Sequence, residues 1–133
     1  MNSILKNILA VIIGIIVGMI VNMSLIILGG ELLPIPEGID PMNANDWELK
    51  QFIFPFLAHA VGTLAGAFIT VKIAASHQLY LALFIGVFFL AGGIAMVFLI
   101  PAPLLFVFAD LILAYIPMGY LGWKMMDCKK KEY

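Results

Sequence analysis

Charged side chains are scarce in this sequence. Of its 133 residues 11% are charged and none is arginine, whereas soluble domains carry about 25% charged residues. This composition excludes an ordinary soluble enzyme. The formal net charge is -1 and no basic run alternates with aromatic residues, so a nucleic-acid-binding surface is excluded as well. Cysteine occurs once, at Cys128, which excludes an intrachain disulfide and a cysteine-based metal centre, and we expect no metal and no cofactor.

Hydrophobic residues, in contrast, make up 64% of the chain. They fall into four runs, each long enough at about 1.5 Å per residue to cross the roughly 30 Å hydrocarbon core of a bilayer. We therefore predict an all-α integral membrane protein, an antiparallel bundle of four transmembrane helices that forms a single domain over residues 1–133. A cleaved signal peptide is the alternative for the first run, but its apolar region would end after about 7–15 residues at a site of small residues. The predicted spans are residues 8–28, 52–75, 79–100 and 104–123.

The lysines predict an orientation, because the cytoplasmic loops of membrane proteins carry the excess of positive charge. With four spans, only Lys50 falls on the outer side. We expect both termini, including a tail over residues 124–133, to face the cytoplasm, and residues 29–51 to form a long extracytoplasmic loop. The expected location is the inner (plasma) membrane, as a multi-pass protein. The lysines on the cytoplasmic side are Lys6, Lys72, Lys124, Lys129, Lys130 and Lys131.

The other connections are short. Residues 76–78 and 101–103 are little more than turns, so the spans that they join must form antiparallel hairpins. In the outer loop, Asn45 followed by Glu48 has the pattern of a capping box and predicts a short helix. In the fourth span Pro117 removes a backbone hydrogen bond, which predicts a kink.

Two of the predicted spans each contain a pair of glycines four residues apart. Burial of apolar surface contributes little to helix association in lipid, so transmembrane helices associate where small residues let their backbones approach. We expect these glycines to pack the helices of one chain against each other, with a seam between two copies as the alternative. They are Gly14, Gly18, Gly62 and Gly66.

Three polar side chains from three spans are expected at the same depth. Asn22, His59 and Asp110 each lie six or seven residues from the predicted outer end of their span, about 9–11 Å below the outer boundary. Ionisable groups within spans are costly, about 2.5–3.5 kcal/mol at the centre on insertion scales, and such groups are a default site hypothesis. We expect Asp110 to bond His59 or Asn22, with Thr63 on the same helix face as His59. The sequence therefore predicts a polar intramembrane site.

This polar layer has two interpretations. In the functional one, His59 and Asp110 share a proton and handle protons or cations that enter from outside. In the structural one, which we favour, hydrogen bonds within the layer orient the helices, each contributing about 0.6 kcal/mol.

Acidic residues gather in the outer loop. Glu31, Glu37 and Asp40 lead this group, and Asp46 and Glu48 follow. They could collect divalent cations, but they lack the fixed spacing of a calcium-binding loop. We therefore expect a solvated acidic surface.

Four stretches of the chain resemble a group of small, uncharacterised four-span bacterial inner-membrane proteins, and the resemblance extends over most of the chain. This resemblance implies a class and a location but no activity. The first span lacks the embedded glutamate of small multidrug exporters, and the chain lacks the pattern of fluoride channels. The stretches are PIPEGID at 34–40, FIFPFLAHAVGTLAGAF at 52–68, GVFFLAGGIAMVFLIPAP at 86–103 and AYIPMGYLG at 114–122.

Three functions compete. The first is a non-catalytic membrane component that binds a protein partner or lipid. The alternative is a small oligomeric transporter or channel that passes protons, cations or a small solute through the Asn22, His59 and Asp110 layer. A membrane enzyme ranks third, because no catalytic motif occurs and Thr63 is the only nucleophile that suggests itself near His59. The expected partners are the lipid bilayer and either further copies of the chain or another membrane protein, but no nucleic acid.

Overall fold

The computed structural model describes residues 1–132, which are helical or in loops and contain no strand. Four stretches of this part of the chain are long and apolar enough to cross a membrane: Ser3–Leu32, Leu49–Ile73, Gln78–Leu99 and Leu104–Lys131. The prediction of an all-helical chain with four helices of membrane-spanning length is thereby confirmed. The elements are α1 (Ser3–Leu32), η1 (Ala44–Asp46), η2 (Leu49–Phe52), α2 (Ile53–Ile73), α3 (Gln78–Leu99), α4 (Leu104–Leu113) and α5 (Ile116–Lys131).

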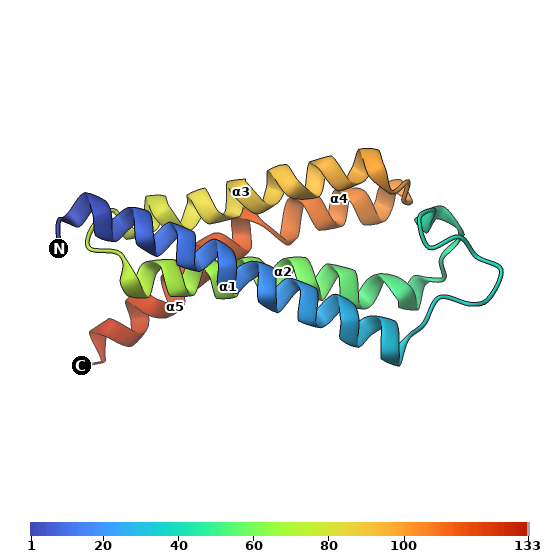
Figure 1. The fold of residues 1–133 in the computed structure, drawn as a ribbon, viewed down its shortest axis with the longest axis horizontal. Coiled ribbons are helices and arrows are strands. Elements are labelled where there is room, and N and C mark those ends of the chain that lie inside the picture. The colour runs from blue at the N-terminus through green and yellow to red at the C-terminus, as the bar shows by residue number, and fades with distance from the viewer. Residues whose placement is uncertain (133) are drawn as a thin grey trace.

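The bundle has two different ends (Figure 1). One end, called the loop end below, carries residues 33–52 and the connection between α3 and α4. The opposite end, called the terminal end, carries the N-terminus, the connection between α2 and α3, and the C-terminal part of α5. Both ends of the chain therefore lie at the same end of the bundle, as an even number of spans requires.

Helices α1 and α2 touch along the two predicted glycine pairs. A Cβ atom added to Gly14 would stand 2.7 Å from the carbonyl oxygen of Gly66, and one added to Gly18 would stand 2.9 Å from that of Gly62. In this seam Thr70 donates a hydrogen bond from its hydroxyl to the Gly66 carbonyl at 2.8 Å and lies 3.3 Å from a carbonyl oxygen of α1. The glycines thus pack the helices of one chain, because any larger side chain would separate the two backbones.

The terminal half of the bundle is closely packed. Helix α5 lies against α2 through Gly122, where an added Cβ would stand 2.9 Å from the carbonyl oxygen of Leu64. Asn7 also joins α1 to the end of α2, since its side chain accepts a hydrogen bond from the Ala75 amide at 2.9 Å and donates one to Ser76 at 3.0 Å. The buried apolar cluster in this half consists of Ala67, Val71, Ala82, Ile85 and Met126.

The fourth span is broken rather than only kinked. Helix α4 ends at Leu113 and α5 begins at Ile116, one residue before Pro117. Proline has no amide hydrogen and its ring collides with the carbonyl four residues earlier, which accounts for the break at the predicted position. The chain between them, Ala114 and Tyr115, is almost completely buried.

The outer loop differs from the prediction in its details. The capping box is formed by Glu48 and Gln51 at the start of η2, not by Asn45 and Glu48. The side chain of Asn43 instead accepts a hydrogen bond from the Asn45 amide, so the predicted helix is replaced by two short 3-10 turns. Because Asn43 offers another acceptor for the Asn45 amide, the capping box forms three residues later than predicted.

Two predicted boundaries also shift. Helix α1 continues to Leu32, so Glu31 belongs to its last turn rather than to the loop. The predicted tail over residues 124–133 is helical as far as Lys131, where the ammonium group of Lys131 lies 3.0 Å from the carboxylate of Asp127, one turn earlier. Such a pair supports a helix that has left the apolar part of the span.

Candidate functional site: a polar pair at a loop-end cavity

Helices α2 and α4 bring His59 and Asp110 into direct contact. The Nδ1 atom of His59 lies 2.7 Å from Oδ1 of Asp110, so the contact expected from the sequence is present. The side chain of Asp110 is 7% exposed and that of His59 is 22% exposed. A pair so far from water is held by its own hydrogen bond and by the neighbours described next.

Tyr115 completes this polar group, although the sequence did not point to it. Its hydroxyl donates a hydrogen bond to Oδ2 of Asp110 at 3.1 Å, and its ring is stacked on the His59 imidazole with the ring centres 5.7 Å apart. In an unbroken helix a residue five positions after Asp110 would point to a different side, about 140° away. The break before Pro117 brings it back, so the proline was the only sequence signal for this contact.

Gly93 of α3 makes the space for the Tyr115 side chain. A Cβ atom on Gly93 would stand 2.5 Å from the Tyr115 hydroxyl oxygen and 2.7 Å from the adjoining ring carbon. Asp110 thus forms hydrogen bonds with His59 and with Tyr115, and packing against Gly93 holds the tyrosine in place.

The other two predicted members of the polar layer behave differently. Thr63 is buried, and its hydroxyl donates to the backbone carbonyl of His59 at 2.8 Å, so it serves its own helix and does not line the cavity described below. Asn22 lies where α1 crosses α2, with its Cβ 3.0 Å from the position of an added Gly62 Cβ. Asn22 is also one of the residues that line that cavity.

A cavity of about 570 Å³ lies beside the polar pair at the loop end. It forms because α1 and α3 diverge toward this end of the bundle (Figure 1). Residues 33–52 cover it, with Ile35 and Trp47 among the residues that form the cover. The walls are mainly apolar, and from the helices they include Asn22, Ile26, Phe54, His59, Met96 and Asp110.

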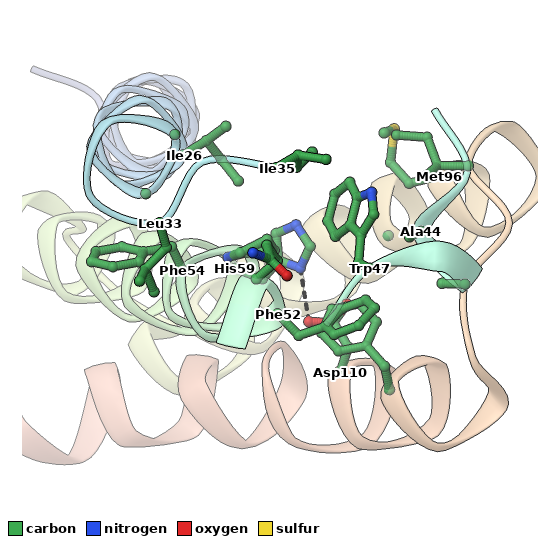
Figure 2. A pocket seen from close by; sticks show the side chains of 18 of the residues that line it. Ile26, Leu33, Ile35, Ala44, Trp47, Phe52, Phe54, His59, Met96 and Asp110 are labelled. Atoms are coloured by element: carbon green, nitrogen blue, oxygen red, sulfur yellow. Dashed lines mark hydrogen bonds and ion pairs between the residues drawn. The ribbon is translucent and has the colours of Figure 1, made fainter. Parts of the chain in front are cut away.

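The imidazole of His59 faces this cavity. In Figure 2 it lies between the indole of Trp47 and the ring of Phe54, with its dashed bond to Asp110 on one side. The other ring nitrogen points away from Asp110, to the side where Ile35 lies. The polar pair therefore presents its second ring nitrogen to a mainly apolar space.

Aromatic rings form one wall of the cavity. The ring centres of Trp47 and Phe52 are 5.5 Å apart, and those of Phe52 and Phe106 are 4.6 Å apart. The indole nitrogen of Trp47 is buried without a hydrogen-bond partner within residues 1–132. This role of Trp47 could not be predicted from the sequence, because nothing local shows that the loop folds back over the helices.

We infer from two exposed wall residues that the cavity opens sideways between α1 and α3. Met23 of α1 and Met96 of α3 both line it, yet they are 55% and 43% exposed on the outer surface of the bundle. A molecule that entered by this route would come from the side of the helices rather than from the end of the bundle.

The acidic residues of the loop do not join this site. Glu31, Glu37 and Asp40 are exposed, and no group of three or more histidine, cysteine or acidic residues in the described part of the chain could hold a metal ion. Asp40 accepts a hydrogen bond from the Met42 amide at 2.9 Å and stabilises a turn.

No protein-family model, curated protein or solved structure matches this chain. Its function has to be argued from the cavity and the groups around it.

Proposed function

We propose that the protein is a non-catalytic component of a bacterial inner membrane and that it binds a lipid-like molecule in the loop-end cavity. The observation that carries this proposal is an apolar cavity of about 570 Å³ with a buried ionisable pair in its wall. Small-molecule sites usually have volumes of about 300–1,000 Å³, apolar walls and a few precisely placed polar groups. This cavity has each of these properties.

The membrane orientation follows from charge. Six of the seven lysines lie toward the terminal end, and five of the eight acidic residues lie at the loop end, so we place the terminal end in the cytoplasm. The cavity then lies in the outer half of the bilayer. Its lateral opening faces the acyl chains, which supports a ligand that is dissolved in the membrane.

The chemistry of the pair supports binding more than catalysis. Thr63, the one nucleophile that the sequence suggested, directs its hydroxyl to a backbone carbonyl and does not line the cavity. His59 and Asp110 can orient a polar group of a ligand, whereas acyl or phosphoryl transfer would need an activated nucleophile beside them.

The test is native mass spectrometry of the protein released from membranes in a mild detergent, with and without a side chain that fills the cavity. Gly30 lines the cavity and Gly92 does not, and an added Cβ meets nothing within 4 Å at either position. We expect a bound lipid-like molecule on the unmodified chain and on Gly92→Trp, and its loss from Gly30→Trp. An empty cavity together with a stoichiometric protein companion would overturn the proposal in favour of a protein-binding component.

A second candidate function is a small oligomeric transporter or channel. It is favoured by the ionisable pair, since His59 reaches the cavity and Asp110 lies directly behind it. The buried cluster and the close glycine contacts fill the terminal half of a single chain. Transport would therefore need a pathway between copies of the chain. Proton or cation flux into liposomes that disappears in Asp110→Asn would establish it.

A further inference from the structure

We infer that the ligand of the loop-end cavity is a membrane-soluble molecule with a flat, carbonyl-bearing ring, of the isoprenoid quinone class. This inference rests on the proposed function and names the chemistry of the molecule bound. It follows from the hydrogen-bonding state of His59, the aromatic wall and the shape of the cavity.

The polar pair offers a hydrogen-bond donor to the cavity. In the net-neutral form of the pair, which avoids burying a net charge in an apolar surrounding, a single proton is shared between His59 and Asp110. If this proton is on His59, both ring nitrogens carry hydrogen. If it is on Asp110, the carboxylic acid donates to Nδ1, and the neutral ring carries its hydrogen on Nε2. In both cases Nε2, the nitrogen that faces the cavity, is a donor.

Tyr115 is compatible with both positions of the proton. Its hydroxyl donates to Oδ2 of Asp110 at 3.1 Å, and this oxygen can accept whether the carboxyl group is ionised or not. Asp110 is held by His59 at one oxygen and by Tyr115 at the other, and these contacts fix the direction in which Nε2 of His59 points. The matching group on the ligand is an acceptor such as a carbonyl oxygen.

The aromatic wall selects a flat ring. Trp47, Phe52 and Phe106 form a continuous series of rings, and Phe54 lies on the other side of His59 (Figure 2). Offset stacking or edge contacts with such rings stabilise a planar partner beyond the burial of its area. A branched acyl ester offers no planar face for these contacts. The buried, unpartnered indole N–H of Trp47 lies on the same wall.

The cavity suits a ring with a long apolar tail better than a whole phospholipid. Its volume of about 570 Å³ is that of a site for a single drug-sized molecule. The opening between Met23 and Met96 lets a tail continue into the bilayer, while the ring stays beside His59.

Binding can be measured through Trp47, because quinone rings quench indole fluorescence on contact. The chain has two tryptophans, Trp47 and Trp123, so Trp123→Phe leaves Trp47 as the sole reporter. In this background, reconstituted in phosphatidylcholine nanodiscs, we expect saturable quenching by decylubiquinone. The phosphatidylcholine of the disc is present in large excess and therefore serves as the competing phospholipid.

The donor is tested from both sides of the contact. His59→Phe keeps a ring and removes the donor, and we expect about tenfold weaker binding, the value of one hydrogen bond of ordinary strength. The matched control is His77→Asn on the turn between α2 and α3, where φ is 53° and asparagine is tolerated. If His59→Phe does not fold, the decyl-substituted ring hydrocarbon that lacks the carbonyl oxygens competes with decylubiquinone in the Trp123→Phe background, and we expect it to bind about tenfold more weakly than the quinone.

The outcomes separate this inference from the proposed function. Equal binding of the quinone and the ring hydrocarbon, or unchanged binding in His59→Phe, would overturn the inference. If a phospholipid is retained in the cavity and no quinone displaces it, the inference is wrong and the proposed function stands. If neither a phospholipid nor a quinone binds, both are wrong.

Discussion

Gly93 and Tyr115 fit together so closely that no other residue type can stand at position 93 without moving the tyrosine. A Cβ atom there would lie 2.5 Å from the hydroxyl oxygen of Tyr115. This hydroxyl donates a hydrogen bond to Asp110. A glycine on α3 thus controls a polar contact between α4 and the connection that follows it.

Leucine at position 93 should disrupt this contact. Gly93→Leu is expected to displace the Tyr115 ring and to lower the free energy of unfolding by about 1–3 kcal/mol, as overpacking does in other cores. The readout is thermal unfolding in detergent, together with quinone-induced quenching of Trp47.

Gly92→Leu is the matched control, since a Cβ at Gly92 meets nothing within 4 Å. If Gly92→Leu and Gly93→Leu lost equal stability, the contact with Tyr115 would not be the cause.

The seam between α1 and α2 predicts a second loss of stability. Gly14→Leu places a side chain against the Gly66 backbone, which cannot move as a side chain can, and we expect a loss of at least about 1–3 kcal/mol in the free energy of unfolding. Gly30→Leu lies on the same helix, with open space around it, and should unfold near the temperature of the unmodified chain. Cross-linking of two copies through α1 with unaltered monomer stability in Gly14→Leu would favour the seam between copies instead.

Asp110 and Tyr115 should be energetically coupled. A double-mutant cycle with Tyr115→Phe and Asp110→Asn is expected to give a coupling energy of about 0.6 kcal/mol and at most about 1.7 kcal/mol, the range measured for hydrogen bonds between transmembrane helices. The measurement is reversible unfolding in mixed micelles. Strict additivity of the two single variants would show that the 3.1 Å contact contributes nothing to stability.

The orientation in the membrane can be tested with single cysteines. Met42 is 56% exposed in the outer loop, and Cys128 is exposed on α5. In spheroplasts, a membrane-impermeant maleimide should label Met42→Cys in a Cys128→Ser background and should leave the natural Cys128 unlabelled until the cells are broken. The opposite pattern would reverse the proposed orientation and move the cavity to the cytoplasmic half of the bilayer.

The sequence predicted the parts of the fold that depend on length and on uniform geometry. Four apolar runs gave the four helices, and a constant rise per residue put His59 and Asp110 at one depth before any contact was known. The glycine spacing likewise predicted the seam between α1 and α2. These inferences needed only the helical repeat and the thickness of the bilayer.

The parts that depend on tertiary contacts escaped prediction. Tyr115 reaches Asp110 only because the helix breaks, and Trp47 reaches the cavity only because the loop folds over the bundle, where Gln51 donates to the Pro34 carbonyl at 3.3 Å. The capping box shifted because Asn43 competed for the Asn45 amide. Distant residues decided the first two cases, whereas the capping box was decided by a neighbour two residues away.

The break in the fourth span also affects how the chain meets the surface of a bilayer. After the break, α5 leaves the direction of the other helices and its last turn lies to one side of the bundle (Figure 1). This turn carries Lys129, Lys130 and Lys131. In the proposed orientation this turn lies beside the other helices at the cytoplasmic surface, where lysine side chains attract anionic lipids by about 1 kcal/mol each.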